Sequence, residues 1–178
     1  MSRIISGRYG GLHLRGPRHE VRPTTGKTKE YIFNVLQTFD AVRVLDLFAG
    51  TGALGIEALS RGASFVCFVD NDHRSLRLIR ENLRLTGAAP AAWECLKADA
   101  LRFIGNDRDS YDLILADPPY KLELPPEFIA ACGSRLGPGG IFVLEYTSRR
   151  SVGTAALEIF REKRMGGTTV YMFRKPPA

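Results

Sequence analysis

Hydrophobic residues follow two alternating spacings through the body of the chain, between about residues 27 and 144. Short, nearly continuous apolar runs indicate strands buried on both faces of a parallel sheet, at 42–45, 65–69, 93–96, 111–116 and 141–144. Apolar residues that recur every three or four positions indicate helices in the flanking segments, at 27–39, 54–59, 76–83, 101–104 and 128–136. Repeated strand–helix units with right-handed crossovers predict an α/β fold, Rossmann-like, with a doubly wound and mostly parallel sheet.

The N-terminal part of the chain breaks this alternation. Short alternating runs at 3–6 and 12–15 flank Gly10-Gly11, a pattern that predicts a β-hairpin. We therefore expect a hairpin extension over residues 1–20 and a single compact domain over residues 21–178.

The C-terminal part departs from it as well. The tetrad at 137–140, Gly-Pro-Gly-Gly, predicts a sharp turn before the last parallel strand. Strand-like runs at 157–164 and 168–173 are joined by Gly166-Gly167, and so short a connection makes the two strands antiparallel. We expect the sheet to end in this antiparallel pair.

The composition is that of an ordinary globular protein. The 178 residues are 44% hydrophobic and 25% charged, and no apolar stretch approaches the roughly 20 residues that cross a bilayer. The first residues lack the apolar segment of a signal peptide. Three cysteines without ligand spacing indicate a reducing compartment, and the three histidines are isolated from one another. We expect a cytoplasmic monomer that holds no metal and contacts no membrane.

Positive charge is concentrated near the N-terminus. Residues 1–30 hold seven arginines and lysines against two glutamates, so five of the six net positive charges lie there. A basic segment beside a nearly neutral body favours a polyanionic partner, and the interleaved glycines and Tyr9 favour nucleic acid. The alternative is an ordinary solvated surface. The candidate RNA-binding residues are Arg3, Arg8, Arg15, Arg22 and Lys27.

Asp117-Pro118-Pro119-Tyr120 directly follows the apolar run at 111–116 and so marks the carboxyl end of a buried strand. The prolines fix the backbone and remove two donors, which leaves acceptors to face a ligand. A carboxylate, a fixed carbonyl group and a flat ring on which a base can stack could together hold the exocyclic amine of a nucleobase. We take these four residues as candidate catalytic residues. The alternative is an acidic turn that only ends the strand.

A glycine-rich turn follows the first strand of the body. It begins at Asp46 and Phe48, and it carries Gly50, Gly52 and Gly55 into the next helix. Glycines allow the tight turn and let a ligand approach the N–H groups at the helix start. Asp46 would repel the pyrophosphate of a dinucleotide, whereas S-adenosylmethionine carries a sulfonium and an ammonium group and no phosphate. The turn therefore favours S-adenosylmethionine; a packing turn without a ligand is the alternative.

Acidic residues also follow the second and third strands. Asp70 suits a carboxylate that accepts ribose hydroxyls, and Asp99 suits an acceptor for the adenine amine. Each could instead cap the next helix, and so could Asn71 or Asp72. The candidate cofactor residues in these turns are Asp46, Phe48, Gly50, Gly52, Asp70, Asn71, Asp99 and Ala100.

An acidic residue after each of the first four body strands, with glycines after the first, resembles the class I S-adenosylmethionine-dependent methyltransferases that carry an Asp-Pro-Pro-Tyr motif. The chain is most similar to their RsmD-type family. The resemblance rests on Arg3-Ile4-Ile5-Ser6-Gly7, Arg22-Pro23-Thr24-Thr25, Phe33-Asn34, the glycine-rich segment at 46–52, Glu81-Asn82 and Asp117-Pro118-Pro119-Tyr120.

This resemblance implies an enzyme that methylates the exocyclic N2 amine of a guanine in bacterial small-subunit (16S) ribosomal RNA, within a subunit particle or an assembly intermediate. It also implies that Thr24 lies near the cofactor. The chain departs from the family where Gly26-Lys27 replaces a usual Asp-Arg pair and Thr28-Lys29 replaces a common Val-Arg pair. Lysine does not reproduce the bidentate geometry of arginine, so the sequence leaves open whether this loop makes the RNA or cofactor contacts of the family.

Three other functions use part of the same pattern. An amino methyltransferase acting on adenine N6 of DNA or RNA would share the Asp-Pro-Pro-Tyr motif, although about 178 residues leave little room for a DNA-recognition region. A nicotinamide oxidoreductase would share the glycines but has no use for that motif. A non-catalytic RNA-binding module could retain the cofactor fold.

Overall fold

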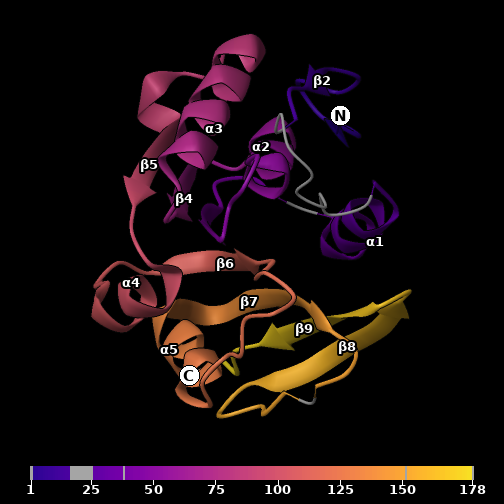
Figure 1. Cartoon of the computed structure of the whole chain (residues 1–178), viewed down its shortest axis with the longest axis vertical. Helices are drawn as coiled ribbons and strands as arrows, with labels where there is room; N and C mark the ends of the chain where they lie inside the picture. The colour runs from indigo at the N-terminus through magenta and orange to yellow at the C-terminus, as the bar shows by residue number, and fades with distance from the viewer. Residues whose placement is uncertain (1, 17–25, 38, 151, 178) are drawn as a thin grey trace.

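The computed structural model describes residues 2–16, 26–37, 39–150 and 152–177. Its described residues form a seven-stranded sheet in the order β5-β4-β3-β6-β7-β9-β8, together with a separate two-stranded sheet near the N-terminus (Figure 1). The strands of the larger sheet are β3 (Arg43–Leu47), β4 (Phe65–Asp70), β5 (Trp93–Lys97), β6 (Tyr111–Ala116), β7 (Leu136–Thr147), β8 (Glu158–Met165) and β9 (Thr168–Arg174).

The pairing of these strands confirms the expected topology. The five strands from β5 to β7 are parallel, whereas β9 pairs antiparallel with both β7 and β8. The doubly wound sheet with an antiparallel C-terminal end is therefore as the sequence predicted. Among the helices that the structure describes, none has the length and apolarity to cross a membrane.

Helices cover both faces of the sheet. They are α1 (Gly26–Leu36), α2 (Ala53–Ser60), α3 (His73–Thr86), α4 (Ala100–Asn106) and α5 (Glu127–Arg135), with a short 3₁₀ turn, η1 (Pro90–Ala92). Helices α1 to α3 pack into one apolar cluster, and α4 and α5 pack into the other. Strand residues alternate between the two clusters: Val44 faces the first and Leu45 the second.

The segment at 137–140 differs from the sequence prediction. It is not a turn ahead of the last parallel strand but lies inside β7, because Tyr111 pairs with Leu136 and Leu113 already pairs with Ile141. Four residues of β7 therefore stand opposite one residue of β6. Gly139 lies in the left-handed region, with φ of +72°, which a glycine adopts without strain. The predicted turn is thus an enlarged β-bulge, and hydrogen bonding to β6 resumes beyond it.

The N-terminal hairpin is present but shorter than the sequence suggested. Its strands β1 (Ser2–Arg3) and β2 (His13–Leu14) pair antiparallel. Ile4 and Leu14 are fully or almost fully buried in the first apolar cluster. The hairpin therefore packs on the body of the protein, beside α2 (Figure 1).

Candidate active site

Three predicted site residues lie close together at β3, where the order of the strands along the sheet reverses. Strands β4 and β5 lie on one side of β3, and β6 lies on the other. Leu47, the last residue of β3, pairs with Val69 of β4 and with Ala116 of β6. The residues that follow these three are Phe48, Asp70 and Asp117, and they therefore lie beside one another at the carboxyl edge of the sheet. Open α/β sheets bind their ligands at such a switch point.

The glycine-rich turn, residues 48–52, is bent by three left-handed residues. Phe48, Gly50 and Gly52 have φ of +57°, +54° and +75°. The turn is attached to β4 by two bonds, from Ala49 N to the Val69 carbonyl at 3.1 Å and from Gly50 N to Asp70 Oδ2 at 2.8 Å. The left-handed φ of Phe48 costs a non-glycine residue about 1–3 kcal/mol, a strain that is typical of functional turns.

Asp46 lies beneath this turn and is only 2% exposed. Its Oδ2 accepts a hydrogen bond from Gly55 N at 2.9 Å. A Cβ atom at Gly55 would lie 2.4 Å from the Phe68 ring and 2.9 Å from Asp46 Oδ2. Glycine is therefore required at position 55 for α2 to approach both the sheet and the Asp46 carboxylate.

Burial raises the pKa of Asp46 well above 3.8; the Gly55 hydrogen bond opposes this, and the nearby Asp117 and Asp70 carboxylates add to it. The site thus gathers like charges, which disfavours a pyrophosphate and favours a cationic ligand. Gly52, the N-cap residue of α2, makes no side-chain cap, and Asp46 takes the N–H of Gly55, so polar groups of a ligand could contact the other N–H groups of the first turn. The residues present fit S-adenosylmethionine, which would place positive charge near the carboxylates.

Asp70 organises the backbone around it. Its Oδ2 holds Gly50, and its Oδ1 accepts from Asp72 N at 2.8 Å. The cap of α3 is Asp72, which accepts from Arg74 N at 2.9 Å, so Asp70 is not the cap of that helix. Asn71 is exposed between them. Each carboxylate oxygen can accept a second hydrogen bond, and the contact of Asp70 with a ribose stays a prediction.

Asp99 is the N-cap of α4. Its Oδ1 accepts from Arg102 N at 3.0 Å, which is the capping role that the sequence left as the alternative. Asp99 is exposed, and an adenine contact of this side chain stays a prediction. Ala100 is the first residue of α4 and is buried in the second apolar cluster.

The Asp117–Tyr120 turn leaves the sheet directly after β6. Asp117 is partly buried, Pro118 is buried, and Pro119 and Tyr120 are exposed, Tyr120 by 41%. The Pro119 carbonyl accepts from Leu122 N at 2.8 Å, which closes the turn. The ring of Tyr120 therefore reaches solvent, where a base could stack on it.

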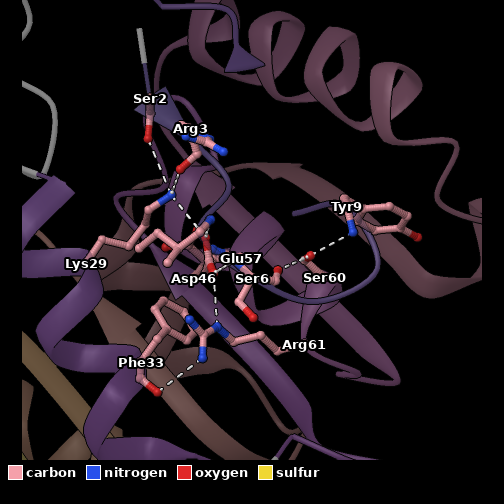
Figure 2. Close-up of polar contacts among 12 residues, drawn as sticks. Ser2, Arg3, Ser6, Tyr9, Lys29, Phe33, Asp46, Glu57, Ser60 and Arg61 are labelled. Atoms are coloured by element: carbon pink, nitrogen blue, oxygen red, sulfur yellow. Dashed lines mark hydrogen bonds and ion pairs between the residues drawn. The ribbon is translucent and has the colours of Figure 1, made fainter. Parts of the chain in front are cut away.

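The N-terminal hairpin is held by a charged cluster that the sequence did not predict (Figure 2). Glu57 of α2, 0% exposed, accepts from Ile5 N at 2.8 Å and from Ser6 N at 3.1 Å. Lys29 Nζ lies 3.1 Å from Glu57 Oε2, and Arg61 Nε lies 2.9 Å from its Oε1. Lys29, which stands where the family commonly has arginine, therefore forms a buried ion pair with Glu57, and this ion pair helps to fix the hairpin.

Ser60 and Gly7 complete this attachment. Tyr9 N donates to Ser60 Oγ at 2.9 Å, and Arg8 N donates to the Ser60 carbonyl at 2.6 Å. A Cβ atom at Gly7 would lie 1.9 Å from the Ser60 carbonyl oxygen, so no larger residue fits there. The hairpin backbone is held at fixed points along α2.

Asn82 joins the end of the hairpin segment to the glycine-rich turn. It is 0% exposed; its Oδ1 accepts from Arg15 N at 2.8 Å, and its Nδ2 donates to the carbonyls of Arg15 at 3.2 Å and Thr51 at 3.1 Å. The sequence did carry a signal for Glu57 and Asn82, the two buried polar residues that hold the N-terminal segment on the body of the protein. Glu57 and Asn82 are polar residues at positions where the helical spacing places apolar ones, next to Ile56 and Leu83.

The candidate RNA-binding residues lie on the surface where the structure describes them. Arg3, Arg8, Arg15 and Lys27 are exposed, and Arg15 forms an ion pair of 3.2 Å with Glu81. Arg22, and the candidate cofactor residue Thr24, lie outside the described residues.

Comparison with known proteins shows the family to which this chain belongs. The model of the family described as Conserved hypothetical protein 95 matches residues 2–174. YlbH of Bacillus subtilis, provisionally named an rRNA methyltransferase, is 41% identical over 67% of this chain and 67% of its own length. Ribosomal RNA small subunit methyltransferase D of Escherichia coli is 35% identical over 71% of this chain and 64% of its own length. The aligned region thus spans about two thirds of each of these relatives.

The solved structure of yhhF from Escherichia coli, provisionally named a methyltransferase, superposes with a TM-score of 0.86 at 26% identity and covers 98% of both chains. The likeness to this structure therefore includes the N-terminal hairpin as well as the sheet. On the family match, the sequence identities and the shared architecture, this chain belongs to the Conserved hypothetical protein 95 (RsmD/YlbH) family of class I S-adenosylmethionine-dependent methyltransferases.

Proposed function

We propose that this protein methylates the exocyclic N2 amine of a guanine in the small-subunit ribosomal RNA of a bacterium, in the cytoplasm. The observation that carries the proposal is the pairing of Leu47 with Ala116, because it sets the Asp117–Tyr120 turn directly beside the glycine-rich turn. An amine held at Asp117 would then lie next to a cofactor bound over residues 48–52. The names of the relatives YlbH and RsmD support ribosomal RNA as the substrate.

In this proposal the carboxyl edge of β3, β4 and β5 holds the cofactor. Asp46 and the start of α2 would face its charged amino-acid part, Asp70 its ribose hydroxyls and Asp99 its adenine amine. S-adenosylmethionine supplies an electrophilic methyl group when it is bound, and the protein contributes position and electrostatics. Burial raises the pKa of Asp46, and a cation bound nearby would oppose that shift and favour the ionised carboxylate.

The turn after β6 would hold the target base. The Asp117 carboxylate would accept a hydrogen bond from one N2–H group, the Pro118 carbonyl group would accept one from the other, and Tyr120 would stack on the ring. Positive charge grows on the nitrogen during methyl transfer, so a carboxylate beside it stabilises the transition state more than the ground state. The target guanine must leave its stack to reach this turn, and an unpaired base in a loop costs least to extrude.

The test is methyl transfer from labelled S-adenosylmethionine to small ribosomal subunits and to naked 16S RNA, followed by mass spectrometry of the nucleosides. We expect N2-methylguanosine from the wild type. Asp117→Asn should lower the rate by at least about 100-fold, as for the loss of one electrostatic transition-state contact. Cofactor binding, measured by calorimetry, should change little.

Other results would redirect the proposal. N6-methyladenosine as the product would establish the adenine alternative, and RNA binding without any transfer would establish a non-catalytic module. An Asp117→Asn enzyme that keeps full activity would remove Asp117 from the chemistry.

A further inference from the structure

A pocket of about 420 Å³ lies beside the Asp117–Tyr120 turn, and the proposed mechanism gives it no role. It opens between the segment that follows this turn, residues 123–126, and the end of β7 with the residues after it. Strands β6 and β7 are parallel, with Ala116 paired to Leu144, so both segments leave the sheet at the same carboxyl edge. The pocket therefore lies on the side of the Asp117–Tyr120 turn that faces away from β3.

Hydrogen bonds attach the pocket wall to this turn. Tyr146 of β7 is 4% exposed, and its hydroxyl accepts from Leu124 N at 3.2 Å and donates to the Leu122 carbonyl at 3.1 Å. Arg150 Nη1 donates to the same carbonyl at 3.1 Å and to the Tyr146 hydroxyl at 3.2 Å. Leu122 N in turn donates to the Pro119 carbonyl. The wall and the turn thus form one connected structure.

The lining combines apolar surface with two arginines and one glutamate, Glu123, so its charged side chains sum to one positive charge. Its apolar residues are Leu124, Pro125, Pro126, Ile129 and Val152. Arg149 and Arg150 supply the charge; the guanidinium of Arg150 is held by its bonds and lies 4.0 Å from Glu123. The Arg149 side chain is exposed, and among the described residues no carboxylate forms an ion pair with it.

This combination suits a nucleotide. A base has apolar faces that pack on proline and leucine, and a phosphate accepts hydrogen bonds from arginine with the added strength of opposite charge. The volume is in the range of sites that bind small organic molecules, about 300–1,000 Å³. Single-stranded RNA offers such groups on both sides of an extruded base.

We propose that this pocket binds the nucleotide adjacent to the target guanine, with its phosphate on Arg149 and its base against Leu124 and the two prolines. The proposal rests on the proposed function, because it takes RNA as the substrate. It assigns the order of ligands along the sheet edge: cofactor at β3 to β5, target base at β6 and neighbouring nucleotide at β7.

The first test measures the binding of transcribed 16S RNA to the intact protein over a range of salt concentrations. Arg149→Ala should weaken binding by about tenfold and reduce the slope of log K against log salt by about 0.7, the value for one contact to single-stranded phosphate. Arg108→Ala is the matched control, because Arg108 is exposed before β6, at the opposite edge of the sheet. It should change neither quantity.

The second test locates the phosphate by ethylation interference on RNA that the enzyme methylates. In the wild type, ethylation next to the target guanine should block methylation, and in Arg149→Ala the same ethylation should have no further effect. Equal binding by the Arg149 and Arg108 variants, or unchanged interference in Arg149→Ala, would overturn the proposal. An effect of Arg149→Ala on assembled subunits but not on naked RNA would assign the pocket to a ribosomal protein instead.

These readouts separate the two proposals. RNA affinity and its salt dependence do not require methyl transfer, so the pocket can be tested even where no methylated guanine is found. Conversely, a wild type that forms N2-methylguanosine while Arg149→Ala binds RNA normally would leave the proposed function in place and refute only the pocket.

Discussion

Replacing Glu57 by glutamine should destabilise the protein more than replacing its partner Lys29 by methionine. Glu57 is fully buried. It accepts hydrogen bonds from the backbone N–H groups of Ile5 and Ser6, and it forms ion pairs with Lys29 and Arg61. The Glu57→Gln variant keeps the shape but removes the negative charge, so the buried Lys29 ammonium keeps only neutral acceptors: the Arg3 carbonyl at 2.6 Å, the Ser2 hydroxyl at 3.4 Å and at most the one amide oxygen of the glutamine. Removing one partner of a buried ion pair costs about 3–5 kcal/mol.

Lys29→Met has the smaller effect for a structural reason. Glu57 then keeps Arg61 Nε and the two backbone N–H groups of the hairpin, so its charge stays compensated. The loss is close to that of one hydrogen bond to a charged group, about 1.5–3 kcal/mol. For a protein of this size, each kcal/mol lowers Tm by about 2–4 °C. We expect Tm to fall by about 6–20 °C in Glu57→Gln and by about 3–12 °C in Lys29→Met.

The pH dependence gives an independent check. Burial lowers the pKa of Lys29 below 10.5, against the opposing charge of Glu57, and loss of that charge lowers the pKa further. Between the folded pKa and 10.5 the unfolded chain binds more protons than the folded protein, so stability rises with pH in this window. The deficit of Glu57→Gln relative to the wild type should therefore shrink as the pH is raised from 7 towards 10.

The assays are urea unfolding of both single variants and the double variant, with hydrogen exchange at Ile5 and Ser6. The double variant should recover part of the loss of Glu57→Gln, because no buried ammonium remains. Exchange at the two amides should accelerate in Glu57→Gln and stay slow in Lys29→Met. If Lys29→Met costs as much as Glu57→Gln, or if neither changes exchange of the hairpin amides, Glu57 does not hold the hairpin.

Three further predictions concern the cofactor side of the site. The folded pKa of Asp46 lies above the unfolded value of 3.8, so its ionisation costs stability as the pH rises through the raised pKa. Asp46→Asn should therefore raise Tm more at pH 8 than at pH 5, and it should weaken cofactor binding in calorimetry. An equal gain in Tm at both pH values would contradict this. Gly55→Ala should lower the free energy of unfolding by at least about 1–3 kcal/mol through overpacking. Gly105→Ala, where a Cβ atom meets nothing within 4 Å, should instead stabilise α4 by about 0.5–1 kcal/mol. Equal urea midpoints of the two variants would refute the packing argument. Asn82→Ala should lower the free energy of unfolding by about 1–3 kcal/mol, because it leaves buried polar groups unpaired. It should also weaken both cofactor and RNA binding, since Asn82 holds Thr51 and Arg15. Unchanged affinities for both ligands would show that Asn82 only supports the fold.

Several features of the fold and site were predictable because they depend on residues near one another in sequence. Apolar runs gave the parallel strands, and Gly166-Gly167 required an antiparallel pair. The capping alternative for Asp99 was likewise a local matter of a carboxylate three residues before an N–H group. The turn expected at 137–140 was wrong because only pairing with β6 reveals that the strand continues through it as a bulge.

The sequence by itself determined the order of strands and helices, the acidic and glycine residues at the strand ends, and hence the class of chemistry. Only the tertiary structure decided that Asp70 holds the glycine-rich turn, that Lys29 pairs with Glu57 inside the protein, and that Asn82 joins Arg15 to Thr51. The physical reason is that hydrophobic spacing and turn chemistry act over a few residues. The partner of a buried polar group is set by packing between segments as far as 67 positions apart, where burial leaves no water to replace a missing hydrogen bond.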